Sequence, residues 1–274
     1  TNNKEYYQIV LDKSPFYAES GGQVGDTGTL TAASGEKIVI TNTVKENNLS
    51  IHIAEKLPSG IDGIFTAEID ITKRESTANN HTATHLLHKA LRETLGTHIE
   101  QKGSLVSPSY FRFDFSHFEK ITDEDLRKVE KLVNKYIRDN SPRDEYREVP
   151  VDVAKSMGAM ALFGEKYGDT VRVIRFGDSI ELCGGTHTSS TGNIGLFKII
   201  SESAIAAGVR RIEATTGEYA EKLVENNEDT IKTIKQLLNN TPNILTAVQK
   251  LIGENETLGR NLEEAMKERA KSLK

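Results

Sequence analysis

The segment His81-Thr-Ala-Thr-His85 places two histidines four residues apart within a helical hydrophobic pattern. In an α-helix this spacing puts both imidazoles on one face, one turn apart. A second pair, in Cys183-Gly-Gly-Thr-His187, has the same spacing, but its two glycines favour a loop. Cys183 is the only cysteine of the chain. Each residue alone is ordinarily a surface or core residue, whereas the two pairs together predict a zinc site of His81, His85, Cys183 and His187.

The composition bounds the class of protein. The 274 residues suffice for one large or two medium domains, and the net charge of −5 does not suggest general nucleic-acid binding but leaves room for a local basic patch. A single cysteine allows no disulfide within the chain and suggests a reducing compartment, so we expect a cytoplasmic location. No signal-peptide pattern opens the given sequence, and no stretch of it is apolar for long enough to span a membrane. The chain starts without Met and stops within a charged helical pattern, so we expect a fragment of a longer protein.

Residues 1–71 have a β pattern. Residues 7–11, 37–40 and 63–69 are rich in β-branched and aromatic residues, as in strands. Between them lie turn-rich stretches, such as the glycine-rich residues 20–28. Short strands with frequent turns predict a small N-terminal β-barrel.

Residues 72–216 predict an α+β domain. Thr72 and Glu75 have the spacing of a capping box at the start of the histidine helix, and Gly96 is suited to end it. Residues 104–116 predict a hairpin in which alternate phenylalanines, from Phe111 to Phe115, pack in the core. A second helix is predicted from Thr122 to about residue 140, followed by strands at 170–176, 179–182 and 194–203.

Residues 217–274 predict a helical arm. One helix runs to about residue 238, Asn239-Asn240 breaks it, and Thr241-Pro242 starts the next. Apolar residues in the second helix fall on heptad spacing, with Asn255 among them. The pattern predicts either an antiparallel helical hairpin within one chain, which we favour, or a coiled-coil seam that joins two chains in a homo-oligomer.

Five motifs, in this order along the chain, together resemble the editing domain of alanyl-tRNA synthetase. They are Glu19-Ser-Gly-Gly-Gln-Val-Gly-Asp-Thr-Gly28, His81-Thr-Ala-Thr-His-Leu-Leu87, Gln101-Lys-Gly-Ser-Leu105, Cys183-Gly-Gly-Thr-His187 and Gly208-Val-Arg-Arg-Ile-Glu213. The resemblance implies an aminoacyl-tRNA deacylase that binds the acceptor end of tRNA(Ala) and hydrolyses seryl-tRNA(Ala) and glycyl-tRNA(Ala). No nucleotide-binding motif is present, so we expect no use of ATP by this chain.

The same resemblance suggests roles for residues beside the metal. Thr84 is implied in recognition of the seryl hydroxyl, although a helical threonine commonly bonds the carbonyl four residues before it. Gln101 is implied in positioning the ester or the attacking water. Gly184 and Gly185 allow a tight turn and let backbone amides approach the substrate. Gln23 is either part of a flexible turn or a polar contact to the acceptor end.

Cationic side chains within the motifs could bind the phosphates of tRNA. Lys102, Arg210 and Arg211 are predicted to contact tRNA, and such binding weakens as salt rises. Arg172, Arg175 and Lys198 lie near the motifs in sequence, and we interpret them as ordinary surface residues.

The sequence leaves the role of the zinc open. Four protein ligands are typical of structural zinc, whereas catalytic zinc usually keeps one position for water. A zinc-stabilised RNA-binding module without catalysis is therefore an alternative, and a threonyl-type editing domain is another. A zinc protease is disfavoured because residue 82 is Thr, where the zincin motif has Glu. Cys183 as a covalent nucleophile is disfavoured because a metal would occupy its thiolate.

Overall fold

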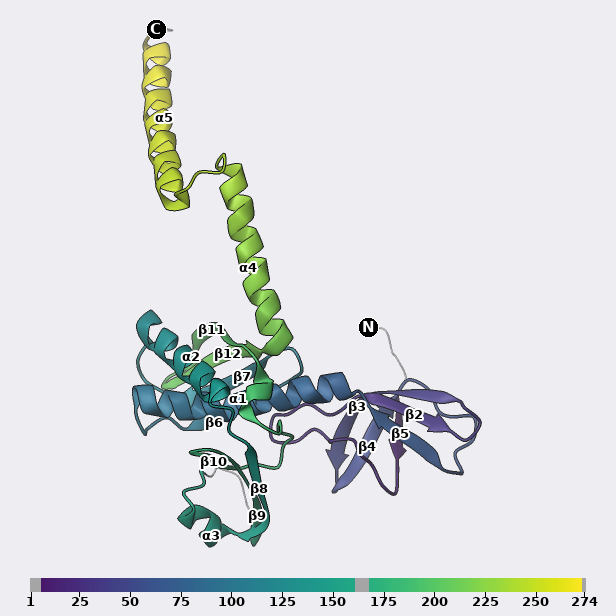
Figure 1. Ribbon diagram of the computed structural model, residues 1–274. Helices are drawn as coiled ribbons and strands as arrows, with labels where there is room; N and C mark the ends of the chain where they lie inside the picture. The colour runs from purple at the N-terminus through teal and green to yellow at the C-terminus, as the bar shows by residue number, and fades with distance from the viewer. Residues whose placement is uncertain (1–5, 161–167, 273–274) are drawn as a thin grey trace. The chain divides into compact units, whose positions relative to one another are not determined.

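The computed structural model of the chain describes residues 6–160 and 168–272. The chain divides into two compact units, Thr1–Glu221 and Lys222–Lys274. Figure 1 follows it from the N-terminal strands, in purple, to the last helix, in yellow. Because the first unit holds both the N-terminal strands and the histidine helix, the predicted division at residues 71 and 216 stays a prediction.

The N-terminal strands form one antiparallel sheet of five strands, in the order β1-β4-β3-β2-β5. Its strands are β1 (Tyr7–Val10), β2 (Gly28–Ala32), β3 (Lys37–Glu46), β4 (Leu49–Ala54) and β5 (Phe65–Ile69). Phe16, Leu30, Ile38 and Ile40 are buried against one another and form its core. The predicted strands correspond to β1, β3 and β5, whereas β2 and β4 were not predicted.

The predicted closed barrel is wrong. β1 and β5 lie at opposite edges of the sheet and do not pair with each other in the described part of the chain. A cavity of about 300 Å³ lies between Ile9 of β1 and Phe65 of β5, and Leu57 and Ile61 of the connecting segment line it. Because β1 has only 4 residues and this segment intervenes, the two edges do not meet in a ladder.

A second sheet carries the main hydrophobic core. Its order is β11-β12-β7-β6, and helices α1 (Ile71–Leu95) and α2 (Asp123–Arg138) pack with it. Its strands are β6 (Gln101–Val106), β7 (Phe111–Ser116), β11 (Phe197–Ala206) and β12 (Val209–Thr216). Phe111, Phe113 and Phe115 of β7 are fully buried, which confirms their predicted core role.

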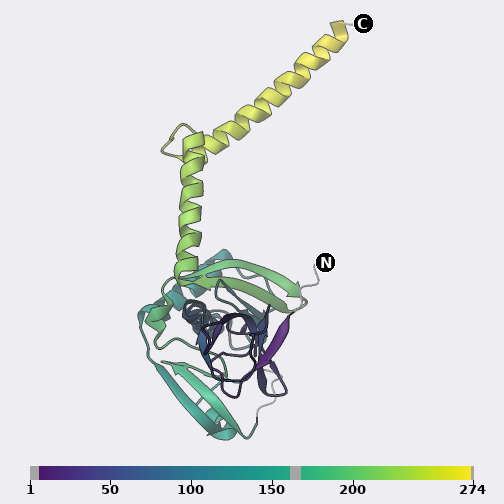
Figure 2. The ribbon, with the colours of Figure 1, turned by 90° about the vertical axis from the view of Figure 1, so that its right-hand side faces the viewer.

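The third sheet leads directly to the cysteine of the ligand set. It has the order β10-β9-β8, with β8 (Arg143–Pro150), β9 (Thr170–Phe176) and β10 (Ser179–Leu182). The bounds of β9 and β10 are those predicted, whereas β11 begins three residues later than predicted, after the short helix η1 (Thr191–Ile194). The small helix α3 (Val151–Ser156) follows β8. Both views place α1 between this sheet and the four-stranded sheet (Figure 1 and Figure 2).

Helix α1 is capped two residues earlier than predicted, since the predicted capping box starts at Thr72. Asp70 is its N-cap, and the Asp70 carboxylate accepts a hydrogen bond from the Lys73 amide at 3.1 Å. Thr72 therefore lies inside the helix, because Asp70 already supplies the acceptor that a cap requires. Gly96 ends the helix as predicted, with φ of 118° and its amide bonded to the Arg92 carbonyl.

The helical arm consists of α4 (Gly217–Leu237) and α5 (Ile244–Ser272). Asn239 and Asn240 both have φ of 56°, which confirms the predicted break. Asn243, rather than Thr241-Pro242, caps α5, because its side chain accepts from the Thr246 amide at 3.1 Å. None of the described residues of α5 is buried, so the predicted hairpin is not formed, and the coiled-coil seam stays a prediction. None of the described helices is long and apolar enough to span a membrane.

Candidate metal centre

Helix α1 supplies the first two ligands. His81 and His85 are buried, and their ring centroids lie 5.3 Å apart in an edge-to-face arrangement. The spacing of one helical turn sets this separation, since residues i and i+4 are neighbours on a helix surface. The helix pair therefore needs no other element to bring its members together.

The loop that follows β10, residues 183–187, supplies the other two ligands, Cys183 and His187, and we call it the ligand loop. The Cys183 sulfur lies 3.4 Å from His81 Nε2 and 3.2 Å from His187 Nε2. One donor atom from each of His81, His85, Cys183 and His187 lies within 4.8 Å of the others. A tetrahedral zinc with bonds of about 2.0–2.3 Å separates its ligand atoms by about 3.3–3.8 Å. The donor set and the two sulfur–nitrogen distances therefore fit zinc, and the predicted convergence of the four residues is confirmed.

Burial keeps the three imidazoles uncharged. Burial lowers the pKa of His81 to about 3, with a further contribution from His85. Burial also lowers the pKa of His85, and it lowers that of His187 well below the usual range, with repulsion from His81 added. Neutral imidazoles are the form that binds a metal, so the site is poised for metal binding at neutral pH.

Thr82 orients His187. The Thr82 hydroxyl donates to the Ala78 carbonyl at 2.9 Å and lies 3.1 Å from His187 Nδ1. With its one proton committed to Ala78, the hydroxyl can only accept from His187. His187 Nδ1 therefore carries its proton, which leaves the lone pair on Nε2, the nitrogen nearest Cys183. Such orienting contacts are typical of histidine ligands.

Two arginines hold the ligand loop from outside. Arg172 of β9 donates to the carbonyl of Cys183 at 3.0 Å and to that of Gly185 at 2.6 Å. Arg143 of β8 donates to the carbonyl of His187 at 2.7 Å. The interpretation of Arg172 as an ordinary surface residue is wrong, because its guanidinium fixes the loop between two ligands. Arg175 bonds the Gly177 carbonyl, and Lys198 pairs with Glu130, away from the loop.

The two glycines of the loop differ in their surroundings. A Cβ on Gly185 would lie 2.0 Å from Cε1 of His81, so only glycine fits there. A Cβ on Gly184 would meet no atom within 4 Å. Gly185 is thus required for the close approach of loop and helix, whereas Gly184 is open to the pocket.

A buried carboxylate lies beside the ligand set. Glu181 of β10 is 3% exposed and lies 3.4 Å from His85 Nε2 and 3.3 Å from His88 Nδ1. Burial raises its pKa, but the neighbouring His85 and His88 outweigh this effect and bring the pKa to about 2. Glu181 is not in the group of four whose donor atoms converge, so it lies outside the ligand set.

A cavity of about 310 Å³ opens onto the ligands. Thr84 and Gln101 line it together with Gly184, and so do His81, His85 and Cys183. Tyr17 lines it as well, and burial, followed by the charge on Cys183, raises the pKa of its hydroxyl to about 12. The Thr84 hydroxyl also donates to the Asn80 carbonyl at 2.9 Å, so the helical bond considered as its alternative role is present.

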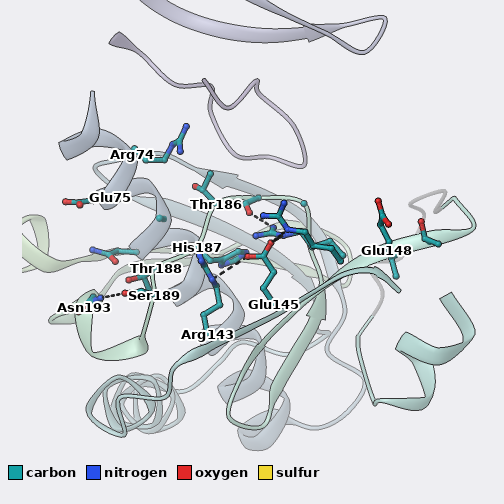
Figure 3. Close-up of a pocket in the computed structure, with 18 residues that line it drawn as sticks. Arg74, Glu75, Arg143, Glu145, Glu148, Thr186, His187, Thr188, Ser189 and Asn193 are labelled. Carbon is teal, nitrogen blue, oxygen red and sulfur yellow. Dashed lines mark hydrogen bonds and ion pairs between the residues drawn. The ribbon is translucent and has the colours of Figure 1, made fainter. Parts of the chain in front are cut away.

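A larger cleft of about 1030 Å³ lies on the other side of the ligand loop. Figure 3 shows Arg143, His187 and Glu145 in it, with Asn193 and Ser189 at one end and Glu148 at the other. The cleft and the cavity share five lining residues. They are Thr170, Val171, Arg172, Gly184 and Gly185.

Four of the predicted tRNA-contact residues are buried or paired within the protein and do not face the two pockets. Gln23 is fully buried, so it is not a contact on the pocket surface. Arg210 is 9% exposed and ion-paired with Glu202, and Arg211 makes two bonds to Asp114, at 2.7 and 2.9 Å. Lys102 pairs with Glu100 at 3.0 Å. None of these four is among the described residues that line the cavity or the cleft.

Comparison with known protein families gives two matched segments of the chain. Residues 171–213 match the family described as threonyl and alanyl tRNA synthetase second additional domain, and residues 1–68 match the family described as tRNA synthetases class II (A). The chain is 58% identical to alanine–tRNA ligases of Bacteroides fragilis and Bacteroides thetaiotaomicron, and 54% identical to that of Porphyromonas gingivalis. The alignments cover 99% of this chain. The chain belongs to the alanyl-tRNA synthetase family.

The chain spans 31% of the length of these alanine–tRNA ligases. Its ligand loop lies within the match to the threonyl and alanyl additional domain, whereas its histidine helix lies outside both matched segments. Sequence reasoning missed Thr82, Arg143 and Glu181 as parts of the site. Glu181 lies in β10, two residues before Cys183, which directly follows the strand, so strand alternation would place both side chains on one side, and that signal was available.

Proposed function

We propose that this chain hydrolyses the ester bond of seryl-tRNA(Ala) and glycyl-tRNA(Ala), an editing activity. The observation that supports it best is the cavity of about 310 Å³ in which Thr84 and Gln101 face the ligand set. A cavity of this size beside a set of metal-binding side chains suits an aminoacyl group better than a macromolecular surface. In the reaction, water adds to the acyl carbon and the bond to the ribose oxygen breaks, which releases the amino acid and free tRNA.

Thr84 supports selectivity for serine. Its proton is committed to the Asn80 carbonyl at 2.9 Å, so toward the cavity its oxygen can only accept a hydrogen bond. A seryl hydroxyl can donate to that oxygen, whereas an alanyl methyl cannot and would leave a buried acceptor unpaired. Such an unpaired group costs about 1–3 kcal/mol, which corresponds to roughly fivefold to 150-fold in rate.

Gln101 is placed to hold the ester or the attacking water. The pairing of β6 with β7 is shifted between Gln101 and Gly103, and a bulge of this kind changes the direction of a side chain beside it. The Gln101 amide lies 3.5 Å from the Ser104 hydroxyl, so its amide group retains capacity for a substrate. A zinc held by the four ligands would act as a Lewis acid on the ester carbonyl or on water.

The cleft beside the ligand loop offers a path for the acceptor end of tRNA(Ala). It shares Gly184 and Gly185 with the cavity, so a nucleotide in the cleft could place its acyl group at the metal. Arg147 is 78% exposed and lines the cleft, and Lys102 follows Gln101 directly. We therefore infer phosphate contacts from Arg147 and Lys102, and binding that weakens with salt.

A deacylation assay tests the proposal. Seryl-, glycyl- and alanyl-tRNA(Ala) are incubated with the chain before and after treatment with a chelator. We expect the first two to be hydrolysed faster than the third, and the chelator to abolish the difference. Equal loss of all three esters at the rate of the buffer alone would overturn the proposal.

A non-catalytic tRNA-binding module is the second candidate. It is favoured by the number of ligands, because four side chains can complete a tetrahedral zinc and leave no position for water. In that case the chain binds tRNA(Ala) in a salt-dependent manner but leaves each ester intact, and the same assay with a binding measurement separates the two.

A further inference from the structure

Gln23 lies in the loop between β1 and β2, and it connects this loop to both halves of the metal centre. Its side-chain oxygen lies 2.7 Å from His81 Nδ1 and accepts from the Thr186 amide at 2.9 Å. Its side-chain nitrogen donates to the Thr186 hydroxyl at 2.8 Å. A backbone amide can only donate, so the atom facing it is the oxygen, and the orientation of the Gln23 amide is fixed.

This orientation determines the proton on His81. Because the Gln23 oxygen only accepts, His81 Nδ1 carries a proton, and the lone pair of the imidazole resides on Nε2. His81 Nε2 is the nitrogen that lies 3.4 Å from the Cys183 sulfur, within the cluster of ligand atoms. Gln23 therefore favours the tautomer that a metal at this site requires.

The same amide fixes the ligand loop. Thr186 stands between Cys183 and His187 in sequence, and it receives and donates one hydrogen bond each with Gln23. The contact with His81 is made from the same oxygen, so one side chain sets the distance between the helix and the loop. The fully buried position of Gln23 excludes water from these bonds, which strengthens them.

We propose that Gln23 is a positioning residue of the metal centre, and that the loop segment between β1 and β2 thereby sets the metal affinity of the editing site. The segment is itself anchored on β6, because the Val24 amide donates to the Val106 carbonyl at 3.0 Å and the Val106 amide donates to the Gly22 carbonyl at 2.7 Å. Gln23 lies in residues 1–68, which match the family described as tRNA synthetases class II (A), and outside the match to the additional domain. Metal binding at residues 81–187 thus depends on a contribution from the preceding part of the chain.

Two substitutions of Gln23 separate positioning from packing. Gln23→Met keeps the length and volume of the side chain but removes the acceptor. Gln23→Glu keeps an acceptor for His81 and for the Thr186 amide, and the Thr186 hydroxyl can rotate to donate to it. We expect zinc to bind about 10–100-fold more weakly to Gln23→Met, whereas Gln23→Glu stays within about threefold of the unsubstituted chain.

Zinc affinity is measured by competition with a colorimetric chelator, and the ligand field is followed by the visible spectrum of the cobalt-loaded protein. Thr43→Val is the matched control, because Thr43 is fully buried in the N-terminal sheet and bonds the Asp26 carbonyl, away from the ligands. It should leave zinc affinity and the cobalt spectrum unchanged. Equal zinc affinity in Gln23→Met and the unsubstituted chain would overturn the proposal, and so would equal losses in Gln23→Met and Thr43→Val.

The inference rests on the metal centre that the proposed function uses, and the two can fail separately. If the unsubstituted chain binds no zinc, the metal centre and the role of Gln23 fail together. If zinc affinity follows the expected order but no ester is hydrolysed, only the proposed function fails. If esters are hydrolysed and Gln23→Met binds zinc normally, only the role of Gln23 fails.

Discussion

His81 and His85 lie on a helix whose own geometry sets their spacing, whereas Cys183 and His187 lie on a loop held by side chains from other elements. The helix pair needs only the α1 backbone, which is capped by Asp70 and ended by Gly96. The loop pair depends on Arg172 of β9, and the sequence distance from Gln23 to its Thr186 partner is 163 residues. A site assembled in this way has one preformed half and one half that responds to its surroundings.

Removal of the metal should have the largest effect of the changes considered, and it should loosen the ligand loop but not helix α1. After treatment with a chelator, we expect hydrogen exchange of the loop amides from Gly184 to Thr188 to become more than about tenfold faster. The buried stretch of α1 around His81 should change less than about twofold, because core packing holds it. Hydrogen exchange with mass spectrometry measures both in one sample. Equal deprotection of helix and loop would show that the helix half is not preformed.

The two loop glycines give the next largest effect. Gly185→Ala places a Cβ against the His81 ring and must push loop and helix apart, so zinc affinity should fall by about 100-fold or more. Gly184→Ala meets no neighbouring atom and should change zinc affinity by less than about threefold. Chelator competition on the two variants measures the difference. A similar affinity in both variants would mean that the loop does not approach the helix as closely as described.

Loss of an arginine should have a moderate effect. Arg172→Met leaves the Cys183 and Gly185 carbonyls without their donor, and we expect zinc affinity to fall by about tenfold to thirtyfold. Arg175→Met is the control on the same strand, because Arg175 bonds only the Gly177 carbonyl among the contacts described for it. Its zinc affinity should be unchanged. An unchanged affinity in Arg172→Met would show that the metal alone orders the loop.

The comparison also explains what could be predicted from the sequence. His81 and His85 were predicted to lie on one face of a helix, because their spacing is a local periodicity of the sequence. The buried phenylalanines of β7 were predicted from a local periodicity as well, the alternation of a strand. The glycines predicted a turn, and the four ligands were found because each carries its own chemistry. Arg172 and Gln23 were misinterpreted, because their roles come from partners far along the chain, and an arginine or glutamine alone looks like a surface residue.

The predictions of the β-barrel and of the helical hairpin were wrong for the same reason, because both depend on partners outside the local pattern. Alternating short strands predicted β structure in residues 7–69, but whether β1 meets β5 depends on the segment between them, which no local pattern specifies. Heptad spacing in α5 predicted an apolar stripe, but such a stripe does not specify which surface packs against it. Leu251, Leu258 and Leu262 are all exposed in the described chain.

Thr84 should give the smallest effect, and one on selectivity rather than on the metal. It lies on the preformed half and bonds the Asn80 carbonyl, so Thr84→Val keeps the shape of the side chain but removes the acceptor for a seryl hydroxyl. We expect the ratio of seryl- to alanyl-tRNA(Ala) hydrolysis to fall by about fivefold to tenfold, with zinc content unchanged. Thr77→Val is the matched control, since Thr77 makes the same helical bond to the Lys73 carbonyl and does not line the described cavity. If Thr77→Val lowered the ratio as much as Thr84→Val, the loss would come from the helix rather than from contact with serine. A ratio unchanged in both variants would remove Thr84 from substrate recognition and leave Gln101 and the metal to account for it.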